Sequence, residues 1–291
     1  MGSLRQVSAA RAIGLLLGTA ADGVVGEHKH LGRLLQGRSG ALLAGAALLT
    51  GVCVERAGRK RPVLQAAGTA VTTWAVLGGT ELAVRSTSLA RDLEEGELAS
   101  ARGRLATLDA RRTESLDVIG ISRASVESVA RHTSDSVVGP LFWGAVAGIP
   151  GLIASRALAA LRGLGRPVAT LDTLADLAPT RVAAAFTVAG APVVGGSASG
   201  AWRAWRRDTI AHPDPNSGRV EAAFAGALGV RLGGRAVYPH GLEERPVLGD
   251  GRNPDAGHVT RAVELSRVIG SLTALSSAVL AVLLGFRRRS R

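Results

Sequence analysis

Residues 268–286 read VIGSLTALSSAVLAVLLGF, and this uncharged run decides the fold class. A helix needs roughly 20 predominantly apolar residues to cross the hydrocarbon core of a bilayer. Three further uncharged runs of about 19–21 residues meet that requirement: 62–80, 136–155 and 182–202. Each run could also be the buried helix of a soluble protein. Four of them in one chain argue against that alternative, so we predict four membrane spans.

Two shorter apolar runs lie near the N-terminus. The run 39–54 is marginal and is predicted as a fifth span, whereas 12–21 is too short to cross a bilayer alone and is predicted as re-entrant or interfacial. The predicted fold class is therefore an all-α, multi-pass integral membrane protein with about four to six transmembrane or membrane-associated helices. We expect one membrane-embedded domain over 1–291, located in the cell membrane with the lipid bilayer as its partner.

The composition agrees with this class and excludes several others. Mean hydropathy is +0.22, aromatic residues are only 3%, and 38 glycines supply small side chains that let membrane helices approach closely. The net charge of +12 is explained by arginines that flank membrane spans. Nucleic acid is not an expected partner, because one Tyr and four scattered Trp cannot interleave a basic face with stacking rings. Cys53 is the only cysteine, which excludes disulfides and thiolate metal sites.

Two long polar segments, 85–135 and 203–267, interrupt the apolar runs and are expected to carry amphipathic helices. Apolar spacing predicts helices over 87–108 and 113–131, and in the first of them acidic residues precede basic ones. The short basic turn 55–61 and the arginine-rich tail 287–291 are predicted in the cytoplasm. The two long segments are expected on the same side of the membrane. The sequence does not decide whether that side is the cytoplasm, because miscounting one span reverses the assignment.

The segment 211–234, AHPDPNSGRVEAAFAGALGVRLGG, is the most specific polar stretch. Asn216 or Ser217 is a suitable helix N-cap after Pro215, and Gly218 would let the backbone approach a ligand. A helix N-terminus can bind an anion through its free N–H groups. Ordinary helix capping explains the same residues, and the exit Arg231–Gly234 is equally consistent with a plain turn.

Spaced carboxylates provide two candidate cation sites. Glu127, Arg131 and Asp135 fall at i, i+4 and i+8, which predicts either an ion-pair ladder or a Mg²⁺ or amine site in which Arg131 bridges the carboxylates. Asp172 and Asp176 share a helix face and suit a hard cation with nucleotide phosphates, or are simply acids at a helix start. Zinc spacings, phosphate loops and the G-x-S-x-G elbow are absent, so no bound prosthetic group is expected.

In sequence order these segments resemble the CobD/CbiB family of cobalamin biosynthesis, over nearly the whole chain. The first matching block is Pro215-Asn-Ser-Gly218, Glu221-Ala-Ala, Ala225 to Gly234, Tyr238 and Glu244-Arg-Pro-Val-Leu-Gly249. The second block is Arg112, Leu116-Asp117, Glu127-Ser-Val, Asp135 and Val138-Gly-Pro-Leu-Phe-Trp143. The third block is Leu171-Asp172 with Pro179-Thr-Arg181. Near the N-terminus, Asp22 and Gly32-Arg33-Leu34 fit the family pattern loosely. The chain departs from the family pattern at Arg131-His132, at Thr173 and Asp176, and at His28-Lys-His30.

The resemblance implies an integral membrane enzyme that forms an amide between a corrin propionate and aminopropanol phosphate. Adenosylcobyric acid would be converted to adenosylcobinamide or its phosphate with ATP and Mg²⁺. The implied catalytic residues, which contact Mg²⁺ or the amine, are Glu127, Asp135 and Asp172, with Asp135 and Asp172 as the Mg²⁺ ligands. The implied substrate and phosphate contacts are Arg181, Pro215, Asn216, Ser217, Gly218, Glu221, Arg231, Gly233, Gly234 and Tyr238. Association with other corrin-pathway enzymes is left open.

Two rival functions remain. A non-catalytic corrinoid-binding scaffold or a permease could use the same fold, but a permease should carry polar residues in mid-span and these runs hold little beyond Ser and Thr. A soluble binding protein with apolar helices is the third alternative, and extraction by detergent alone would distinguish it.

Overall fold

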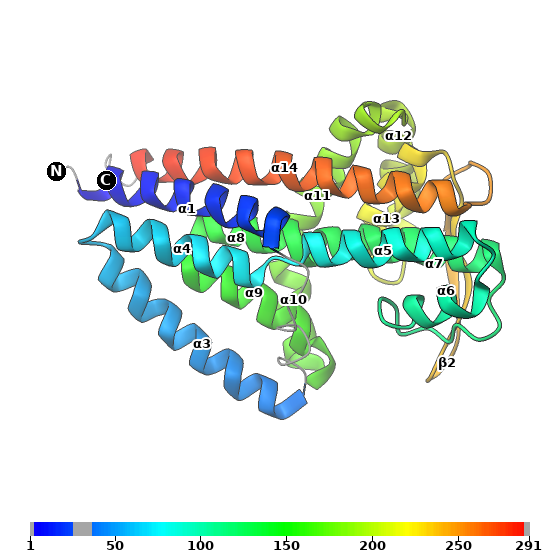
Figure 1. Cartoon of the computed structure of the whole chain (residues 1–291), viewed down its shortest axis with the longest axis horizontal. Coiled ribbons are helices and arrows are strands. Elements are labelled where there is room, and N and C mark those ends of the chain that lie inside the picture. The colour runs from blue at the N-terminus through cyan, green and yellow to red at the C-terminus, as the bar shows by residue number, and fades with distance from the viewer. Residues whose placement is uncertain (1–2, 26–36, 288–291) are drawn as a thin grey trace. The chain divides into compact units, whose positions relative to one another are not determined.

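The computed structural model describes residues 3–25 and 37–287, which divide into two compact units (Figure 1). Unit 1 comprises 1–81, 135–179 and 270–291, and unit 2 comprises 82–134 and 180–269. The family matches at His28-Lys-His30 and Gly32-Arg33-Leu34, and the tail after Arg287, lie outside the described residues. Both units are predominantly helical, which confirms the predicted fold class. The single membrane-embedded domain stays a prediction.

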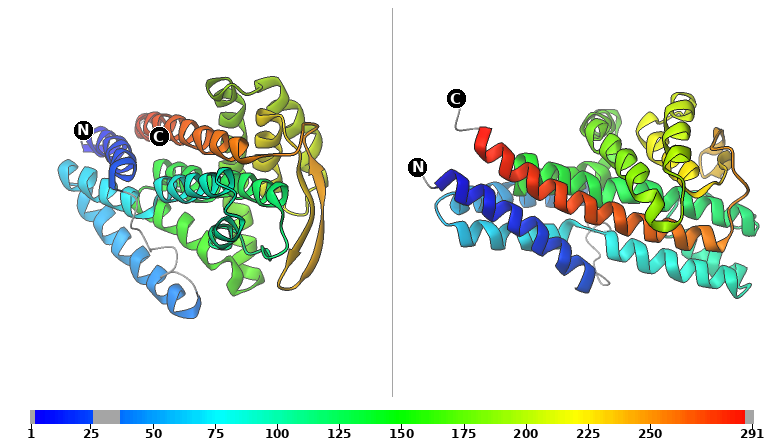
Figure 2. Two further views of the ribbon diagram at one scale, coloured as in Figure 1. Left: turned by 45° about the vertical axis from the view of Figure 1, so that its right-hand side comes forward. Right: turned by 90° about the horizontal axis from the view of Figure 1, so that it is seen from above.

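Unit 1 is built from helices alone. Its elements are α1 (Ser3–Val25), α3 (Gly37–Gly58), α4 (Pro62–Val76), the π-helical turn η2 (Ser134–Val138), α8 (Gly139–Ala147), α9 (Ile149–Leu161), the 3₁₀ turn η3 (Arg162–Leu164), α10 (Arg166–Ala175) and the second half of α14 (Ala256–Arg287). Figure 2 shows the C-terminal half of α14 beside α1. Their contact is apolar, with Ala12 and Leu15 packed in one cluster with Ala274, Ala278 and Ala281.

Glycines bring α1 and α4 into close contact. A Cβ placed on Gly14 would lie 2.6 Å from the Cβ of Thr69, and one on Gly18 would lie 2.5 Å from that of Thr73. The two glycines are four residues apart and therefore share a helix face. Such small-residue faces are how membrane helices pack without a hydrophobic driving force. The expectation that glycine serves close helix packing is confirmed at these positions.

Charged residues inside unit 1 are paired rather than exposed. Arg11 of α1 donates to the Glu55 carboxylate of α3, which also accepts from Gln65 Nε2 (3.0 Å) and from the Ile149 backbone N–H (3.0 Å). Asp22 is buried and accepts from the Thr80 N–H at 3.2 Å. Pairing removes the cost of carrying these charges within apolar helices. Helix α1 therefore continues through Arg11 and Asp22, and the interpretation of 12–21 as too short to cross a membrane is wrong.

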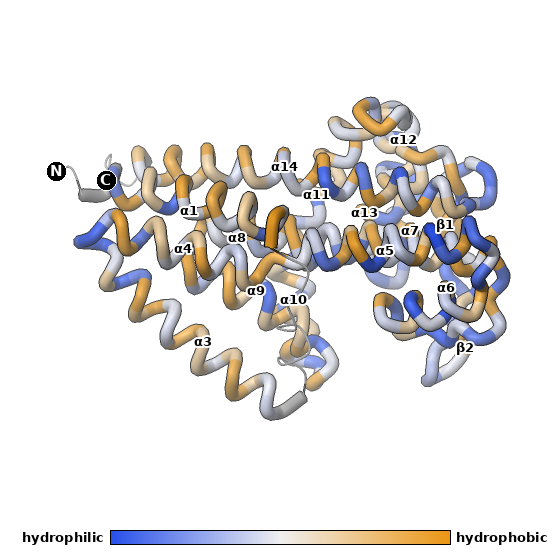
Figure 3. The backbone as a smooth tube through the Cα atoms, in the orientation of Figure 1, coloured by the Kyte–Doolittle hydropathy of each residue, from blue (hydrophilic) through white to orange (hydrophobic). Residues whose placement is uncertain are grey.

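Four helical stretches among the described residues are long and apolar enough to cross a membrane: Gln6–Val25, Ser39–Gly58, Leu177–Val194 and Ala256–Phe286. Apolar colouring follows α1, α3, α4, α8 and the second half of α14 in Figure 3. Large apolar side chains also point outward from these helices, as Leu42 (79% exposed) and Val63 (83% exposed) do. The protein is accordingly a membrane protein. The predicted spans at 39–54 and 268–286 are confirmed.

The other three predicted spans are corrected. The run 62–80 breaks because Leu77 is extended, so α4 has only 15 residues. The run 136–155 breaks at Gly148, whose φ of +73° favours glycine, and α8 and α9 lie on either side. The run 182–202 is displaced: the apolar helix begins at Leu177, its terminal 3₁₀ turn ends at Val194, and Gly195 follows in the left-handed region.

Unit 2 combines helices with one β-hairpin. Its elements are α5 (Gly79–Glu94), α6 (Leu98–Leu105), α7 (Val118–Thr133), α11 (Leu177–Gly190), η4 (Ala191–Val194), α12 (Ala198–Asp208), η5 (Thr209–Ala211), α13 (Pro215–Leu228), β1 (Leu232–Tyr238), β2 (Gly241–Leu248) and the first half of α14. The helices α5, α11 and α14 contribute residues to both units. The predicted helix 87–108 is two helices, separated at Gly96 with φ +79°. The hairpin was not predicted, because its first residues were interpreted as a turn.

Candidate functional site

A buried network of charged side chains lies in the middle of unit 2. We call it the charge network, and its members are Asp109, Arg111, Glu127, Arg131, His212, Glu221 and Arg245. They come from the segment after α6, from α7, from the residues before α13, from α13 itself and from β2. Removing so many charges from water is costly even when they are paired. A unit that needed only stability would be expected to fill this space with apolar side chains.

Glu127 is a carboxylate of the network that accepts three hydrogen bonds. Its Oε2 accepts from Arg111 at 2.7 Å and from Arg245 at 3.3 Å, and its Oε1 accepts from the Gly233 backbone N–H at 2.7 Å. Only 1% of the residue is exposed. The sequence singled out both Glu127 and Gly233, and the structure brings them together.

A β-bulge in β2, where Pro246 and Val247 stand opposite the single residue Gly233, lies where the Gly233 N–H is directed toward Glu127. The antiparallel register shifts between Leu232 and Gly234, and both glycines have positive φ, +79° and +85°. A Cβ on Gly233 would lie 2.0 Å from the Pro246 carbonyl oxygen, so only glycine fits. Bulges of this kind re-aim the backbone beside functional sites. The exit of the 211–234 motif is therefore the start of strand β1, opposite a bulge in β2, and not a plain turn.

Glu221 is the second buried carboxylate and is completely inaccessible to solvent. Its Oε1 accepts from Arg131 at 3.0 Å and lies 3.7 Å from Arg245, while its Oε2 is 3.5 Å from His212 Nε2. The predicted ladder through Glu127, Arg131 and Asp135 is wrong, because Arg131 pairs with Glu221 instead. The π-helical turn η2 begins at Ser134 and interrupts the α-helical spacing before Asp135.

Gly218 makes room for His212 rather than for a ligand. A Cβ at Gly218 would lie 2.5 Å from the His212 Cβ. The imidazole Nδ1 interacts with the backbone of Asp214, whose N–H donates to it at 3.1 Å, and this leaves Nε2 directed at Glu221. The glycine of the Pro-Asn-Ser-Gly motif thus serves the charge network indirectly.

The electrostatics of the network keep its carboxylates ionised. Burial alone would raise the pKa of Asp109, but the Arg111 guanidinium and its hydrogen bonds lower it to about 2. Burial would likewise raise the pKa of Glu221, and His212, Arg131 and Arg245 together hold it below its ordinary value. The carboxylates beside Arg111 and Arg131 outweigh burial and raise the pKa of both guanidinium groups. Asp109, Glu221, Arg111 and Arg131 are therefore fixed, opposed charges at neutral pH.

The pairing in the network is incomplete. Two buried atoms, Arg111 Nε and Arg131 Nε, have no hydrogen-bond partner, and His212 Nε2 and Glu221 Oε2 make only a long contact of 3.5 Å with each other. Buried polar atoms are almost always satisfied in folded proteins, so each exception needs an explanation. Polar capacity left over at a charge cluster is consistent with a bound molecule completing it.

A cavity of about 360 Å³ adjoins the network, and we call it the arginine pocket. Its walls carry three guanidinium groups, Arg111, Arg123 and Arg235, together with residues at the start of α7 and Ala236, Val237 and Asn253. Asp117, the N-cap of α7, is the single carboxylate among the lining residues and accepts from the Gly120 N–H at 2.7 Å. Cavities of this size hold small molecules. Arg111 is already paired with Asp109 and Glu127, and Arg235 with Glu244, whereas Arg123 has no acidic partner among the described residues, so an anionic group is the expected ligand beside Arg123.

Tyr238 lies near the same cation. The Arg111 guanidinium carbon is 6.0 Å from the centre of the Tyr238 ring, and the ring stacks on His240. The segment before α7 is fixed to the hairpin here, because the Arg112 N–H donates to the Val237 carbonyl at 2.7 Å. The predicted site residue Tyr238 is thus placed beside the charge network.

The Pro-Asn-Ser-Gly motif begins α13, but its cap is Asp214. The Asp214 carboxylate accepts from the Asn216 N–H at 3.0 Å and from the Ser217 hydroxyl at 2.6 Å, while Pro215 occupies the first turn. The prediction that Asn216 or Ser217 is the N-cap is therefore wrong. Asn216 instead accepts from Arg219 at 2.7 Å.

Arg181 and Arg231, which the family resemblance implies as phosphate contacts, lie near α13 or its exit. Burial and the nearby Arg181 cation lower the pKa of Arg219, so these two cations lie near each other beside the helix start. Arg231 donates to the Gly251 carbonyl at 2.7 Å. Arg181 and Arg219 therefore form a second basic surface close to the motif.

Asp135 and Asp172 belong to unit 1 and meet at one cation. Arg162 donates to Asp135 at 2.7 Å through Nη2 and lies 3.1 Å from Asp172 through Nε. The Asp135 carboxylate, with Asp172 and Asp176, outweighs burial and raises the pKa of Arg162. No group of three or more His, Cys, Asp or Glu side chains arranged for a metal occurs among residues 3–25 and 37–287.

Several of these residues were missed from the sequence: Asp109, Arg111, Arg162, His212 and Arg245. Arg245 finds its partner Glu127 far along the chain, and Asp109 and Arg111 pair over only two residues in a segment without a recognisable pattern, so local spacing does not predict these contacts. One signal was available, since Arg245 lies inside the family-like segment Glu244–Gly249.

Comparison with known proteins places this arrangement in a family. The family model described as CobD/Cbib protein matches residues 11–266. The chain is 42% identical to the cobalamin biosynthesis protein CobD of Mycobacterium tuberculosis, over 96% of its own length and 97% of that protein. It is 35% identical to the protein of the same name from Geobacter metallireducens (79% and 76% coverage) and 34% identical to that from Chromobacterium violaceum (77% and 74%). No solved structure matches. The chain belongs to the CobD/CbiB family of cobalamin biosynthesis proteins.

Proposed function

We propose that this cobalamin biosynthesis protein is a ligase that joins a corrin propionate to aminopropanol phosphate by an amide bond. The observation that carries the proposal is the arginine pocket beside the charge network. Amide formation from adenosylcobyric acid requires a site that binds a phosphate, holds an amine and stabilises charge on an activated carboxyl group. ATP, when bound, supplies the phosphoryl group for that activation.

The arginine pocket matches the charge distribution of aminopropanol phosphate. Guanidinium groups bind phosphates through paired N–H donors, and Arg123 and Arg235 are the two pocket arginines outside the network. Asp117 offers a carboxylate to the ammonium end of the same molecule. The amine must lose a proton before it attacks, and we assign the first contact with that group to Asp117.

The charge network positions one wall of the pocket. Glu127 and Asp109 both accept from Arg111 Nη2 and hold its guanidinium in one orientation. The guanidinium therefore does not need to reorient during the reaction. Donors that are oriented in advance are the largest electrostatic contribution in many enzymes. Glu127 and Glu221, both predicted as site residues, would act here as positioning residues, since their oxygens contact arginines of the network.

The second basic surface is proposed as a further phosphate site. Asn216, Ser217 and Gly218 lie at the start of α13, where the helix dipole favours anions, with Arg181 and Arg219 nearby. The Asp214 cap already occupies one of the free N–H groups, so the arginines would make most of the contact. Nucleotide phosphates are the ligand we assign to this surface, with Arg231 as a more distant counter-charge.

Asp135 and Asp172 are the residues that we propose to hold Mg²⁺. Mg²⁺ is commonly bound by one or two carboxylates together with waters and substrate phosphates. The two carboxylates that meet at Arg162 fit that donor set, because oxygens close to one guanidinium are close to each other. The ion, when bound, would neutralise phosphate charge, and Arg162 would have to move aside or share the carboxylates.

We also propose a multi-pass arrangement in the cell membrane, on the support of the four apolar helices. Association with other enzymes of corrin assembly remains part of the proposal.

Turnover by the purified protein tests the activity. The protein in detergent is given adenosylcobyric acid, ATP, Mg²⁺ and aminopropanol phosphate, and adenosylcobinamide phosphate is measured by mass spectrometry. We expect product that depends on both ATP and Mg²⁺. If none forms while another family member yields it under identical conditions, the ligase proposal is refuted and the scaffold or permease alternative is favoured.

Asp117→Asn tests the assignment of the pocket. Asn caps a helix as well as Asp does, so the variant removes the charge but keeps the start of α7. We expect the kcat for amide formation to fall at least roughly tenfold, because the ammonium loses its carboxylate, with the thermal midpoint unchanged. Asp250→Asn, an exposed carboxylate paired with Arg207, serves as the matched control. Equal turnover in the two variants would remove Asp117 from the mechanism.

A further inference from the structure

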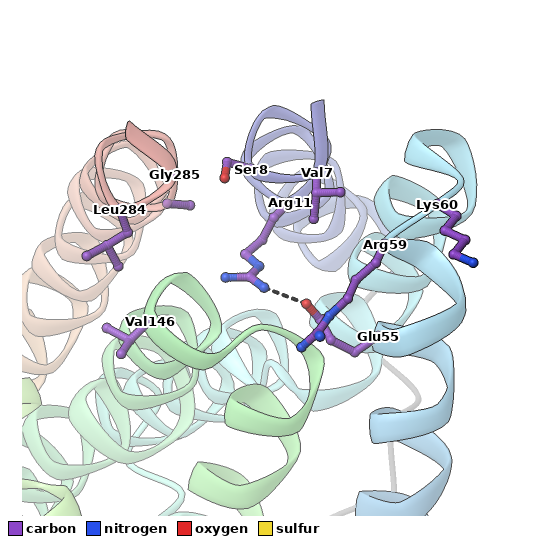
Figure 4. A pocket seen from close by; sticks show the side chains of 10 residues that line it. Val7, Ser8, Arg11, Glu55, Arg59, Lys60, Val146, Leu284 and Gly285 are labelled. Atoms are coloured by element: carbon purple, nitrogen blue, oxygen red, sulfur yellow. Dashed lines mark hydrogen bonds and ion pairs between the residues drawn. The ribbon is translucent and has the colours of Figure 1, made fainter. Parts of the chain in front are cut away.

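A cavity of about 360 Å³ in unit 1 lies outside the proposed ligase site (Figure 4). We call it the interface pocket. Arg11 and Arg59 point toward it, Ser8 and Lys60 also line it although the Lys60 side chain points outward, and Glu55 is the only carboxylate among its lining residues. The opposite wall is apolar and comes from Val146 and from Ala281 and Leu284 of α14. The pocket therefore presents cations on one side and hydrocarbon on the other.

The interface pocket lies where three candidate membrane spans end. Gln6–Val25 begins next to Val7 and Ser8, Ser39–Gly58 ends just before Arg59, and Ala256–Phe286 ends just after Leu284. Helix ends of this kind mark the boundary between the hydrocarbon core and the polar head groups. The cationic side of the pocket consequently lies at head-group depth, and its apolar wall continues into the hydrocarbon region.

The pocket is built around a fixed cation. Glu55 holds Arg11, and the Glu55 carboxylate is itself satisfied by Gln65 and the Ile149 N–H, so its charge is already committed. The Arg11 Nε is buried and has no hydrogen-bond partner. Arg59 and Lys60 are exposed at the rim. Because Glu55 offsets only one of the three cations, an anion is needed to balance the others.

We propose that the interface pocket binds the phosphate of an anionic phospholipid, with an acyl chain lying against Val146, Ala281 and Leu284. A phosphate ester supplies negative charge to balance Arg11, Arg59 and Lys60. Only an amphiphilic phosphate ester would also pack against the apolar wall. Anionic lipids of the cytoplasmic leaflet attract basic segments beside membrane helices, and the basic turn 55–61 is predicted on that side. The site is independent of the proposed ligase activity.

Calorimetric titration of the purified protein in a neutral detergent tests this proposal with three probes. Dihexanoyl phosphatidylglycerol carries both the phosphate charge and the chains, dihexanoyl phosphatidylcholine lacks the net charge, and glycerol phosphate lacks the chains. We expect saturable binding of the first probe, at least tenfold tighter than that of either other probe. Equal binding of glycerol phosphate would mean a site for free phosphate, and equal binding of phosphatidylcholine would mean no recognition of charge; either result overturns the proposal.

Arg59→Gln and Arg61→Gln form a matched pair of variants. Both residues are exposed in the same turn, but only Arg59 lines the pocket. Arg59→Gln should weaken phosphatidylglycerol binding roughly fivefold, as expected for one basic residue near a membrane surface, and Arg59→Lys should restore it. Arg61→Gln should leave it unchanged. Equal losses in Arg59→Gln and Arg61→Gln, with the thermal midpoints of both retained, would reduce the effect to a general basic surface and refute the site.

Discussion

The two units of this protein place their charges and their apolar side chains in opposite locations. In unit 1 large apolar residues such as Leu42 and Val63 are exposed, and most charges lie near helix ends. In unit 2 the core contains Asp109, Arg111 and Glu221, all buried. An apolar exterior is what lipid requires, whereas a charged interior is costly and is kept where function needs it. The contrast is consistent with membrane anchoring by unit 1 and with substrate binding at the arginine pocket of unit 2, while the proposed Mg²⁺ ligands Asp135 and Asp172 lie in unit 1.

The largest effect should follow from removing a carboxylate of the charge network. Glu221→Ala leaves the Arg131 guanidinium without its carboxylate partner, and breaking such a pair costs about 3–5 kcal/mol of unfolding free energy. Denaturant titration in mixed micelles measures it. Glu244→Ala, whose partner Arg235 is exposed, should cost at most about 1 kcal/mol. Similar losses in the two variants would end the distinction between core and surface charge in unit 2.

The next largest effect is the loss of folding stability at low pH. The pKa of Asp109 is about 2 in the folded protein, below its ordinary value of 3.8, so its ionised form stabilises the fold above about pH 4. That contribution, roughly 2 kcal/mol, is lost as the pH falls from about 4 through 2. Asp109→Asn should flatten the dependence of stability on pH in this window. An unchanged slope would show that the network does not depend on the Asp109 charge.

A smaller loss is expected at the helix contact of unit 1. Gly18→Ala puts a methyl group 2.5 Å from the Thr73 Cβ and should cost about 1–3 kcal/mol, as overpacking does. Gly45→Ala in α3 meets no atom within 4 Å and should be neutral or stabilising by up to about 1 kcal/mol. Thermal unfolding in detergent compares the pair. If Gly18→Ala matched Gly45→Ala, close packing of α1 on α4 would be excluded.

The smallest effect tests the start of α13. Asp214→Ala removes the N-cap and should lower stability by about 1 kcal/mol. Ser217→Ala removes only a hydroxyl that donates to the same carboxylate and should cost less. A larger loss in Ser217→Ala than in Asp214→Ala would restore the sequence-based assignment of the cap to the motif itself.

The apolar runs predicted the class of the fold but not the ends of its helices. The span 268–286 was found because nothing interrupts α14, whereas 136–155 failed at Gly148, a break created by the backbone conformation rather than by polarity. The opposite error occurred in α1, where Arg11 and Asp22 look like helix ends. Each is neutralised by a residue distant in sequence, Glu55 and Thr80, and local composition cannot reveal that.

The candidate site was predicted only in part for a similar reason. Glu127, Glu221, Gly233 and Tyr238 lie in segments with a recognisable pattern, and the structure gathers them in unit 2. Their partners Arg111, His212 and Arg245 are single residues in ordinary surroundings. Only the folding of the hairpin against α7 and α13 brings these cations to the carboxylates.

One measurement tests most directly whether unit 2 performs the chemistry: the preference for aminopropanol phosphate over aminopropanol, expressed as the ratio of kcat/KM values. Arg123→Gln removes one guanidinium from the arginine pocket, and Arg206→Gln removes an exposed one from α12 as the control. A hydrogen bond to a charged group contributes about 1.5–3 kcal/mol, so we predict that Arg123→Gln lowers the ratio roughly 10- to 100-fold. The rate with aminopropanol and the behaviour of Arg206→Gln should not change. An unchanged ratio in Arg123→Gln, with active and folded protein, would contradict the account.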